Sequence, residues 1–214
     1  MHERELSDLR REYAVGGLDE SDLASDPVTM FRTWMHGTLT AGLHEPNAMV
    51  LATVSTDGRP TSRIVLLKGL DERGFVFYTN YSSRKAVELE ANPACGLLFP
   101  WHSLERQVRV DGTATRLTPH ENDVYFAARP RASQLGAWAS PQSEVVADRA
   151  ELDRRYAEML ARFAEETVPT PPHWGGYRVE HTSVEFWQGR RGRMHDRLRY
   201  RRTPAGWTTE RLAP

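Results

Sequence analysis

Three short apolar runs between residues 48 and 80 constrain the fold of this chain most. The runs are AMVLATVS, TSRIVLLKG and FVFYTN, and the turn-forming stretches TDGRP and LDERG separate them. Glycine, proline and aspartate between apolar runs of this length are typical of β-hairpins. The segment therefore predicts three strands in an antiparallel meander.

More strand-like runs follow along the chain, together with several helical patterns. The further predicted strands are ACGLLFPW, ERQVRVDGTATRLT, GYRVEHTSVEFWQG, HDRLRYRR and GWTTERLA. The predicted helices are one from SDP at 25–27 with Met30, Phe31, Trp34, Met35 and Leu39 toward the core, SSRKAVELEAN capped by Ser82 or Ser83, PHENDVYFAAR and RASQLGAWAS separated at Pro130, and ADRAELDRRYAEMLARFAEE with Leu152, Tyr156, Met159, Leu160 and Phe163 on one side. PTPPHWGG is predicted to be a linker. Eight or so mainly antiparallel strands with inserted helices favour a small closed barrel.

The 214 residues suit one domain with a substantial core. We expect a single domain over 25–214, preceded by a mobile segment over 1–24 whose short helix ends at the glycine pair 16–17. The single cysteine, Cys95, excludes an intrachain disulfide and a Cys-based zinc cluster, and the eight histidines show no metal-ligand spacing. The charged start MHERELSDLRREY lacks an apolar signal core, so a cytoplasmic location is expected.

Residues 185–202, EFWQGRRGRMHDRLRYRR, hold seven arginines and one histidine, although the whole chain has a formal net charge of only -1. That balance argues against a protein that coats nucleic acid, so these cations act locally. If the stretch continues a strand, Arg193, His195 and Arg197 share one face beside Trp187, and Met194, Asp196 and Leu198 share the other. The cationic face would form a compact pocket wall. The alternative is an arginine-rich edge strand that charge keeps soluble.

Three other groups of residues suit anion binding. Alternation places Arg63 and Lys68 on opposite faces of the RIVLLK strand, where a snorkelling pair is the alternative. In YTNYSSRK, Tyr78 and Thr79 end a strand, while Ser82, Ser83, Arg84 and Lys85 open a helix that suits a phosphate, or that is simply solvated. Tyr125, Arg129 and Ser133 recur every four residues and could meet a phosphate monoester, although an amphipathic helix can offer such a trio by chance.

Taken together, RIVLLKG, FYTNYSSRKA, LLFPWHSLERQVRVDG, YFAARPRASQLGAWAS and FWQGRRGRMHDR resemble the pyridoxamine (pyridoxine) 5'-phosphate oxidase family. The similarity runs from LRREY to the terminal ERLAP, and its order and spacing make it specific. The resemblance implies a mainly β, antiparallel split barrel with inserted helices, forming a homodimer with FMN at the subunit interface. The stretch Arg190-Arg191-Gly192 departs from the family pattern.

The resemblance also implies roles for individual residues. The implied FMN contacts are Arg63, Ile64, Val65, Leu66, Leu67, Lys68, Tyr78, Thr79, Arg84, Lys85, Gln107, Gln142, Ser143, Trp187 and Arg197. The implied substrate contacts are Arg10, Arg11, Glu12 and Tyr13 in a closing N-terminal segment, Lys68, Tyr125, Arg129 and Ser133 at the substrate phosphate, and Arg193, Met194 and His195 at the substrate ring. Arg193, His195 and Arg197 are the expected catalytic residues, and no metal is expected.

The expected activity is oxidation of pyridoxamine or pyridoxine 5'-phosphate to pyridoxal 5'-phosphate, with O2 reduced to H2O2 and ammonia released from the amine. This reaction belongs to vitamin B6 cofactor synthesis or salvage. One alternative is a split-barrel reductase that uses another flavin or a nicotinamide donor. The other is a non-enzymatic protein that binds a vitamin B6 phosphate or nucleic acid. The phosphate trio and RMHDR argue against the first alternative, and the balanced charge argues against nucleic acid.

Overall fold

The computed structural model describes residues 12–14 and 16–214. The chain divides into two compact units. The first consists of Met1–Met49, Leu97–Asp111 and His181–Pro214, and the second consists of Val50–Gly96 and Gly112–Glu180. Most of the helix expected over 1–15 lies outside the described residues, and the division at residue 24 stays a prediction. No described helix is both long and apolar enough to cross a membrane.

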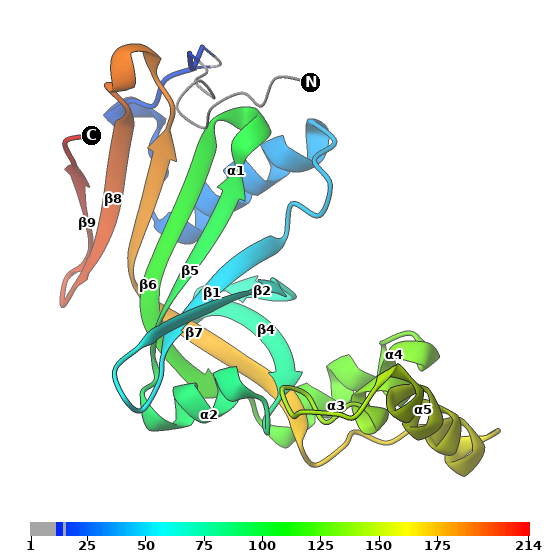
Figure 1. The fold of residues 1–214 in the computed structure, drawn as a ribbon. Helices are drawn as coiled ribbons and strands as arrows, with labels where there is room; N and C mark the ends of the chain where they lie inside the picture. The colour runs from blue at the N-terminus through cyan, green and yellow to red at the C-terminus, as the bar shows by residue number, and fades with distance from the viewer. Residues whose placement is uncertain (1–11, 15) are drawn as a thin grey trace. The chain divides into compact units, whose positions relative to one another are not determined.

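Strands dominate the described chain, with helices between them (Figure 1). The strands are Ala48–Val54 (β1), Pro60–Leu66 (β2), Gly69–Asp71 (β3), Gly74–Asn80 (β4), Ala94–Trp101 (β5), Arg106–Arg116 (β6), Trp174–Gln188 (β7), Asp196–Thr203 (β8) and Gly206–Arg211 (β9). The α-helices are Pro27–Thr40 (α1), Arg84–Ala91 (α2), Pro119–Ala127 (α3), Arg131–Ala139 (α4) and Arg149–Phe163 (α5), and the 3₁₀ turns are Glu20–Asp22 (η2), His102–Leu104 (η3) and Arg191–Arg193 (η4).

The strand order is β2-β1-β5-β6-β7-β4-β3, with β8 paired to β7 and β9 paired to β8. The pairs β3–β4, β4–β7, β7–β8 and β8–β9 are antiparallel. The expected meander of three strands is therefore wrong in one respect, because β4 does not follow β2 in the sheet. The short strand β3 forms a hairpin with one edge of β4, and β7 pairs with the other edge. A strand as buried as β4 gains from neighbours on both sides.

The linker predicted at PTPPHWGG is also wrong at its C-terminal end, because β7 already begins at Trp174. Gly175 and Gly176 pair with Thr79 and Tyr78 of β4. A Cβ atom at Gly175 would lie 2.2 Å from the Tyr81 hydroxyl oxygen. The glycine pair therefore serves close packing within a strand, and not flexibility.

In the first unit, α1 begins as the sequence predicts. Asp26 accepts hydrogen bonds from the amides of Val28 and Thr29, and Pro27 occupies the first turn. Within α1, Phe31 and Trp34 are buried and pack against β-strand aromatics. The core expected for this helix is thus confirmed at Met30, Phe31 and Trp34, whereas Met35 is half-buried and Leu39 is 60% exposed in the last turn.

In the second unit, α3 and α4 are separate helices around Pro130, as expected, and Figure 1 shows them beside α5. A small core joins them to the start of β7, formed by Phe126, Leu135, Phe163, Val168 and Trp174. Leu160 of α5 was expected on the buried side but is 50% exposed, because the nine-residue helix α4 packs against only part of the longer α5.

Gly74 provides a test of the close packing of β4 against β7. Its φ is +140°, and an added Cβ would lie 2.0 Å from the carbonyl oxygen of Val179. Gly58 has φ +81° with no atom within 4 Å of an added Cβ. We expect Gly74→Ala to lower the free energy of unfolding by about 2–4 kcal/mol and Gly58→Ala by about 1 kcal/mol, because only the first adds a backbone clash to the strained φ. If urea unfolding showed the same loss of unfolding free energy for both variants, the register of β4 against β7 would be contradicted.

Candidate active site

The second unit contains a pocket of about 750 Å³, which we call the main pocket. It takes residues from β2, β4, α2 and the helices α3 and α4. Its lining residues are Arg63, Ile64, Val65, Leu66, Lys68, Tyr78, Thr79, Lys85, Tyr125, Ala128, Arg129, Pro130, Ser133, Gln142 and Trp174. The structure thus brings together most of the predicted contacts that lie in this unit. Leu67, Arg84 and Ser143 are predicted contacts that are not among its lining residues.

Arg63 and Lys68 were expected on opposite faces of one strand, and this prediction is wrong. The strand β2 ends at Leu66, and the amide of Lys68 donates to the carbonyl of Val76 at 2.8 Å in the next hairpin. Residues 67 and 68 lie between two strands, so the alternation of β2 does not extend to Lys68, and both cations line the main pocket.

Lys85 is the most buried cation of the main pocket, with 8% of its surface exposed. Its ammonium nitrogen donates to Gln142 Oε1 at 2.9 Å and Ser83 Oγ at 3.3 Å, both neutral partners. Ser83 occupies the N-cap position of α2 without a side-chain cap. Burial and the nearby Arg63 lower the pKa of Lys85 to about 8, while Glu88 opposes the shift. A buried ammonium of this kind favours a bound anion.

Glu88 organises the cations beside Lys85. Its side chain is 4% exposed and lies 3.1 Å from Arg63 Nη2, and it accepts a 2.9 Å bond from Arg84 Nε. Burial alone would raise the pKa of Glu88, but hydrogen bonds from Thr53, Thr61 and the two arginines lower it to about 2. The carboxylate is therefore ionised and fixes Arg63, whereas Arg84 extends along the exposed side of α2.

The other set of residues predicted to bind a phosphate also lines the main pocket. It consists of Tyr125, Arg129 and Ser133. Pro130 divides α3 from α4, yet the turn keeps the three side chains on one wall. The Arg129 guanidinium lies 4.6 Å from the centre of the Trp174 ring, and its buried Nη1 has no hydrogen-bond partner among the described residues. An unsatisfied, buried guanidinium nitrogen indicates a site for an anionic acceptor.

Stacked aromatic rings form one wall of the main pocket. The Tyr78 and Tyr125 rings stack at 3.9 Å, and Trp174 stacks on Tyr78 at 5.2 Å. Burial raises the pKa of Tyr125, so its phenol stays protonated and can donate a hydrogen bond. Sequence reasoning missed Trp174, which stands in the segment predicted to be a linker; an aromatic residue next to two glycines was the available signal.

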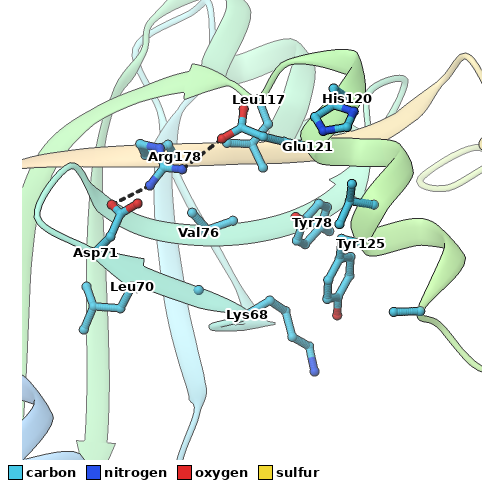
Figure 2. Close-up of a pocket in the computed structure, with 13 residues that line it drawn as sticks. Lys68, Leu70, Asp71, Val76, Tyr78, Leu117, His120, Glu121, Tyr125 and Arg178 are labelled. Carbon is cyan, nitrogen blue, oxygen red and sulfur yellow. Dashed lines mark hydrogen bonds and ion pairs between the residues drawn. The ribbon is translucent and has the colours of Figure 1, made fainter.

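A second pocket of about 510 Å³ shares Lys68, Tyr78 and Tyr125 with the main pocket. Figure 2 shows Arg178 between two carboxylates in this second pocket, while Lys68 extends away from them. Arg178 Nη1 lies 2.7 Å from Asp71 and Nη2 lies 3.2 Å from Glu121. Because Asp71 and Glu121 satisfy the Arg178 charge, Lys68 is the cation lining this pocket that could meet an anionic ligand.

The remaining predicted residues lie in the first unit, where Tyr13, Trp187 and His195 form an aromatic cluster. The Tyr13 ring lies edge-on to Trp187 at 5.8 Å and to His195 at 5.5 Å. Trp187 and His195 lie 4.7 Å apart. Glu12 lies next to this cluster in the chain and is exposed, and Arg10 and Arg11 lie outside the described residues.

The prediction that Arg193, His195 and Arg197 share one face of a strand is wrong for Arg193 and His195. Arg193 belongs to the turn η4 and has φ +63°, and β8 begins only at Asp196. The glycine before Arg193, with φ +62°, helps the chain turn tightly there. Arg193 and Met194 are exposed, and His195 Nδ1 accepts a 3.1 Å hydrogen bond from the amide of Arg190.

Arg197 does lie on β8, where it forms a bidentate pair with Glu185 at 2.8 and 3.1 Å. The pair raises the pKa of Arg197 further, so this guanidinium is fixed in charge and position. Gln107 lies on β6 and is half-buried. Arg199 and Arg201, also on β8, both pair with Glu210.

Four cations line the main pocket: Arg63, Lys68, Lys85 and Arg129. Lys85 offers a buried ammonium near the Arg63 guanidinium that Glu88 fixes, and Arg129 offers an unsatisfied guanidinium nitrogen. Phosphate oxygens can accept bonds from such cations, so the pocket fits phosphate esters.

Known proteins resemble this chain along nearly its whole length. Residues 35–163 match the family model described as pyridoxamine 5'-phosphate oxidase, and residues 174–214 match the pyridoxine 5'-phosphate oxidase C-terminal dimerisation region. The pyridoxine/pyridoxamine 5'-phosphate oxidase of Nocardioides sp. is 62% identical over 210 residues, covering 98% of each chain. The same-named protein of Rubrobacter xylanophilus is 60% identical, covering 99% of this chain and 97% of its own.

Among solved structures, PhzG from Burkholderia lata 383, in complex with tetrahydrophenazine-1-carboxylic acid, matches with a TM-score of 0.88 and 35% identity, covering 94% of this chain and 99% of that chain. These similarities confirm the expected fold class, a mainly β split barrel with inserted helices. With the family models and the full-length relatives in agreement, the chain belongs to the pyridoxamine 5'-phosphate oxidase family.

Proposed function

We propose that this protein is an FMN-dependent oxidase that converts pyridoxamine 5'-phosphate or pyridoxine 5'-phosphate to pyridoxal 5'-phosphate. The observation that carries the proposal is one pocket lined by four cations, Arg63, Lys68, Lys85 and Arg129, which suit phosphate groups. When bound, FMN would supply the two-electron acceptor for oxidation at the 4'-carbon of the substrate, with O2 as the final oxidant and H2O2 as its product. The full-length relatives named for this activity support the same conclusion.

The protein's own part is to bind and orient. Arg63 and Lys85 would hold the FMN phosphate, with Thr79 and Gln142 beside Lys85 fixing the ammonium. The glutamate partner keeps Arg63 in place before the cofactor arrives, which lowers the ordering cost of binding. Arg84, Leu67, Ser143, Gln107, Trp187 and Arg197 are proposed as further flavin contacts from the family resemblance.

Lys68, Tyr125, Arg129 and Ser133 would hold the substrate phosphate. Two cations and two hydroxyl groups can satisfy the oxygens of a phosphate monoester. Arg193 and His195 are proposed to orient the substrate ring, with Glu12 and Tyr13 in the segment that closes on it. Holding the substrate at one end fixes its distance from the reacting group, which is the main rate advantage available to the protein here.

We also propose a homodimer, because residues 174–214 match a dimerisation region. FMN bound between subunits would couple the cofactor to assembly. A monomer in light scattering that keeps full activity at assay concentration would contradict this part of the proposal.

The first experiment asks whether the purified, yellow protein oxidises pyridoxine 5'-phosphate in air. We expect pyridoxal phosphate and H2O2 in equal amounts, and much slower oxidation of pyridoxine. Tetrahydrophenazine-1-carboxylic acid, the ligand of the Burkholderia lata structure, and a nicotinamide donor serve as competing substrates. Oxidation of either without turnover of the phosphate ester would overturn the proposal in favour of another flavoprotein of this fold.

A second prediction concerns pH and Lys85, whose pKa is lowered to about 8. Its ammonium form predominates below that pH, so FMN binding should be tightest there and weaken as pH rises through about 8, by up to about tenfold per pH unit. Fluorescence titration between pH 7 and 9.5 measures the Kd. Riboflavin, which has no phosphate, should show little dependence, and Lys85→Arg should remove it because arginine stays charged. A flat wild-type profile would exclude Lys85 from the phosphate site.

A third prediction separates the two phosphates. Arg129→Ala should raise the KM for pyridoxine 5'-phosphate at least about tenfold while FMN stays bound, because charge-assisted bonds to the substrate phosphate are lost. Discrimination between pyridoxine 5'-phosphate and pyridoxine should fall by the same factor. Arg154→Ala, an exposed cation of α5, is the matched control. Unchanged discrimination would remove Arg129 from the substrate site.

A further inference from the structure

The carboxylate of Asp196 joins three separate segments of the first unit, although Asp196 has no role in the site described above. Its Oδ1 accepts a 2.8 Å bond from Arg211 Nη1 on β9. Its Oδ2 accepts a 3.0 Å bond from the amide of Leu18 and lies 3.2 Å from Arg190 Nε. With its side chain 14% exposed, the carboxylate is well placed for charge-assisted bonds.

The contacts around Asp196 fix the segment 17–20 from both sides. Arg211 also donates to the carbonyl of Leu18 at 3.2 Å and to both carboxylate oxygens of Glu20 at 2.7 and 2.8 Å. Leu18 is only 5% exposed. A Cβ on Gly17 would lie 2.4 Å from Arg190 Nη1, so the backbone passes directly against that side chain.

The contacts of Asp196 are connected to two predicted substrate residues, His195 and Tyr13. Arg190, held by Asp196 through its side chain, donates from its backbone amide to His195 Nδ1. Tyr13 lies edge-on to His195 and Trp187, and the amide of Ala14 donates to Glu105 at 2.9 Å. A Cβ on residue 189, a glycine, would lie 2.8 Å from the Tyr13 ring, so little else fits beneath it.

We propose that Asp196 is a positioning residue. It anchors the segment carrying Tyr13 to β8 and, through Arg190, sets the orientation of His195. Asp196 itself lies on the strand, so it acts on substrate only through these two residues. The activity arm of the test below rests on the proposed function, and the exchange arm does not.

The test compares FMN-saturated wild type with Asp196→Asn, which keeps the shape of the side chain and removes its charge. Hydrogen exchange of peptides within 16–22 should become at least about tenfold faster, while core strands exchange as before. For pyridoxine 5'-phosphate, kcat/KM should fall at least about tenfold, mostly through KM, with the Kd for FMN changed less than about twofold.

Glu210→Gln is the matched control, because Glu210 also pairs with two arginines, Arg199 and Arg201, on the same hairpin. Glu210→Gln should match wild type both in hydrogen exchange within 16–22 and in kcat/KM for pyridoxine 5'-phosphate. Glu20→Gln, an exposed change, should speed exchange in 16–22 in the same direction as Asp196→Asn but less, and it tests the anchor if the first variant folds poorly.

Unchanged exchange in 16–22 for both Asp196→Asn and Glu20→Gln would overturn the proposal. So would equal effects of Asp196→Asn and Glu210→Gln, or faster exchange throughout the chain, since either outcome would make Asp196 a contributor to general stability. If wild type fails to oxidise pyridoxine 5'-phosphate, the proposed function fails, while the exchange arm still decides whether Asp196 is the anchor.

Discussion

The antiparallel pairing of β4 with β7 is the constraint on which the main pocket depends. It sets Tyr78 opposite Gly176 and Asn80 opposite Trp174. Because residue 176 has no Cβ, the Tyr78 ring can lie against β7, where an added Cβ would stand 2.9 Å from it. The pairing thereby brings Trp174 into the aromatic stack, and Trp174 in turn supports the guanidinium of Arg129. One register thus determines the aromatic wall of the pocket and the support of the Arg129 guanidinium.

The charged side chains of the main pocket leave Lys85 without an acidic hydrogen-bond partner, so the pocket favours a bound anion. Glu88 stays ionised despite burial, because four hydrogen bonds hold its pKa near 2. It fixes Arg63 without neutralising Lys85, whose hydrogen-bond partners are neutral. The cost of burying Lys85 appears as its lowered pKa, and a phosphate dianion would reverse it. Such a site is ordered before its ligand arrives, which favours binding.

Local signals predicted much of the fold correctly. Asp26 before a proline marked the start of α1, Pro130 marked the break between α3 and α4, and glycine-containing turns marked the ends of strands. These signals depend on backbone chemistry over a few residues, which the sequence carries in full. The candidate residues themselves came mostly from the family resemblance, since cations at such spacing occur by chance on many surfaces.

The sequence alone determined which segments form strands and helices, but not where each strand ends, and it determined which residue types could bind phosphate. Only the tertiary structure decided which of them meet. Lys68 joined Arg63 because β2 ends before it, and Arg193 left the strand face because η4 precedes β8. Trp174 entered the pocket through pairing with a strand about 95 residues earlier. The physical reason is that competition among backbone hydrogen bonds between distant segments sets where a strand ends and which strand it pairs with. The alternation of side chains along one segment therefore cannot predict either.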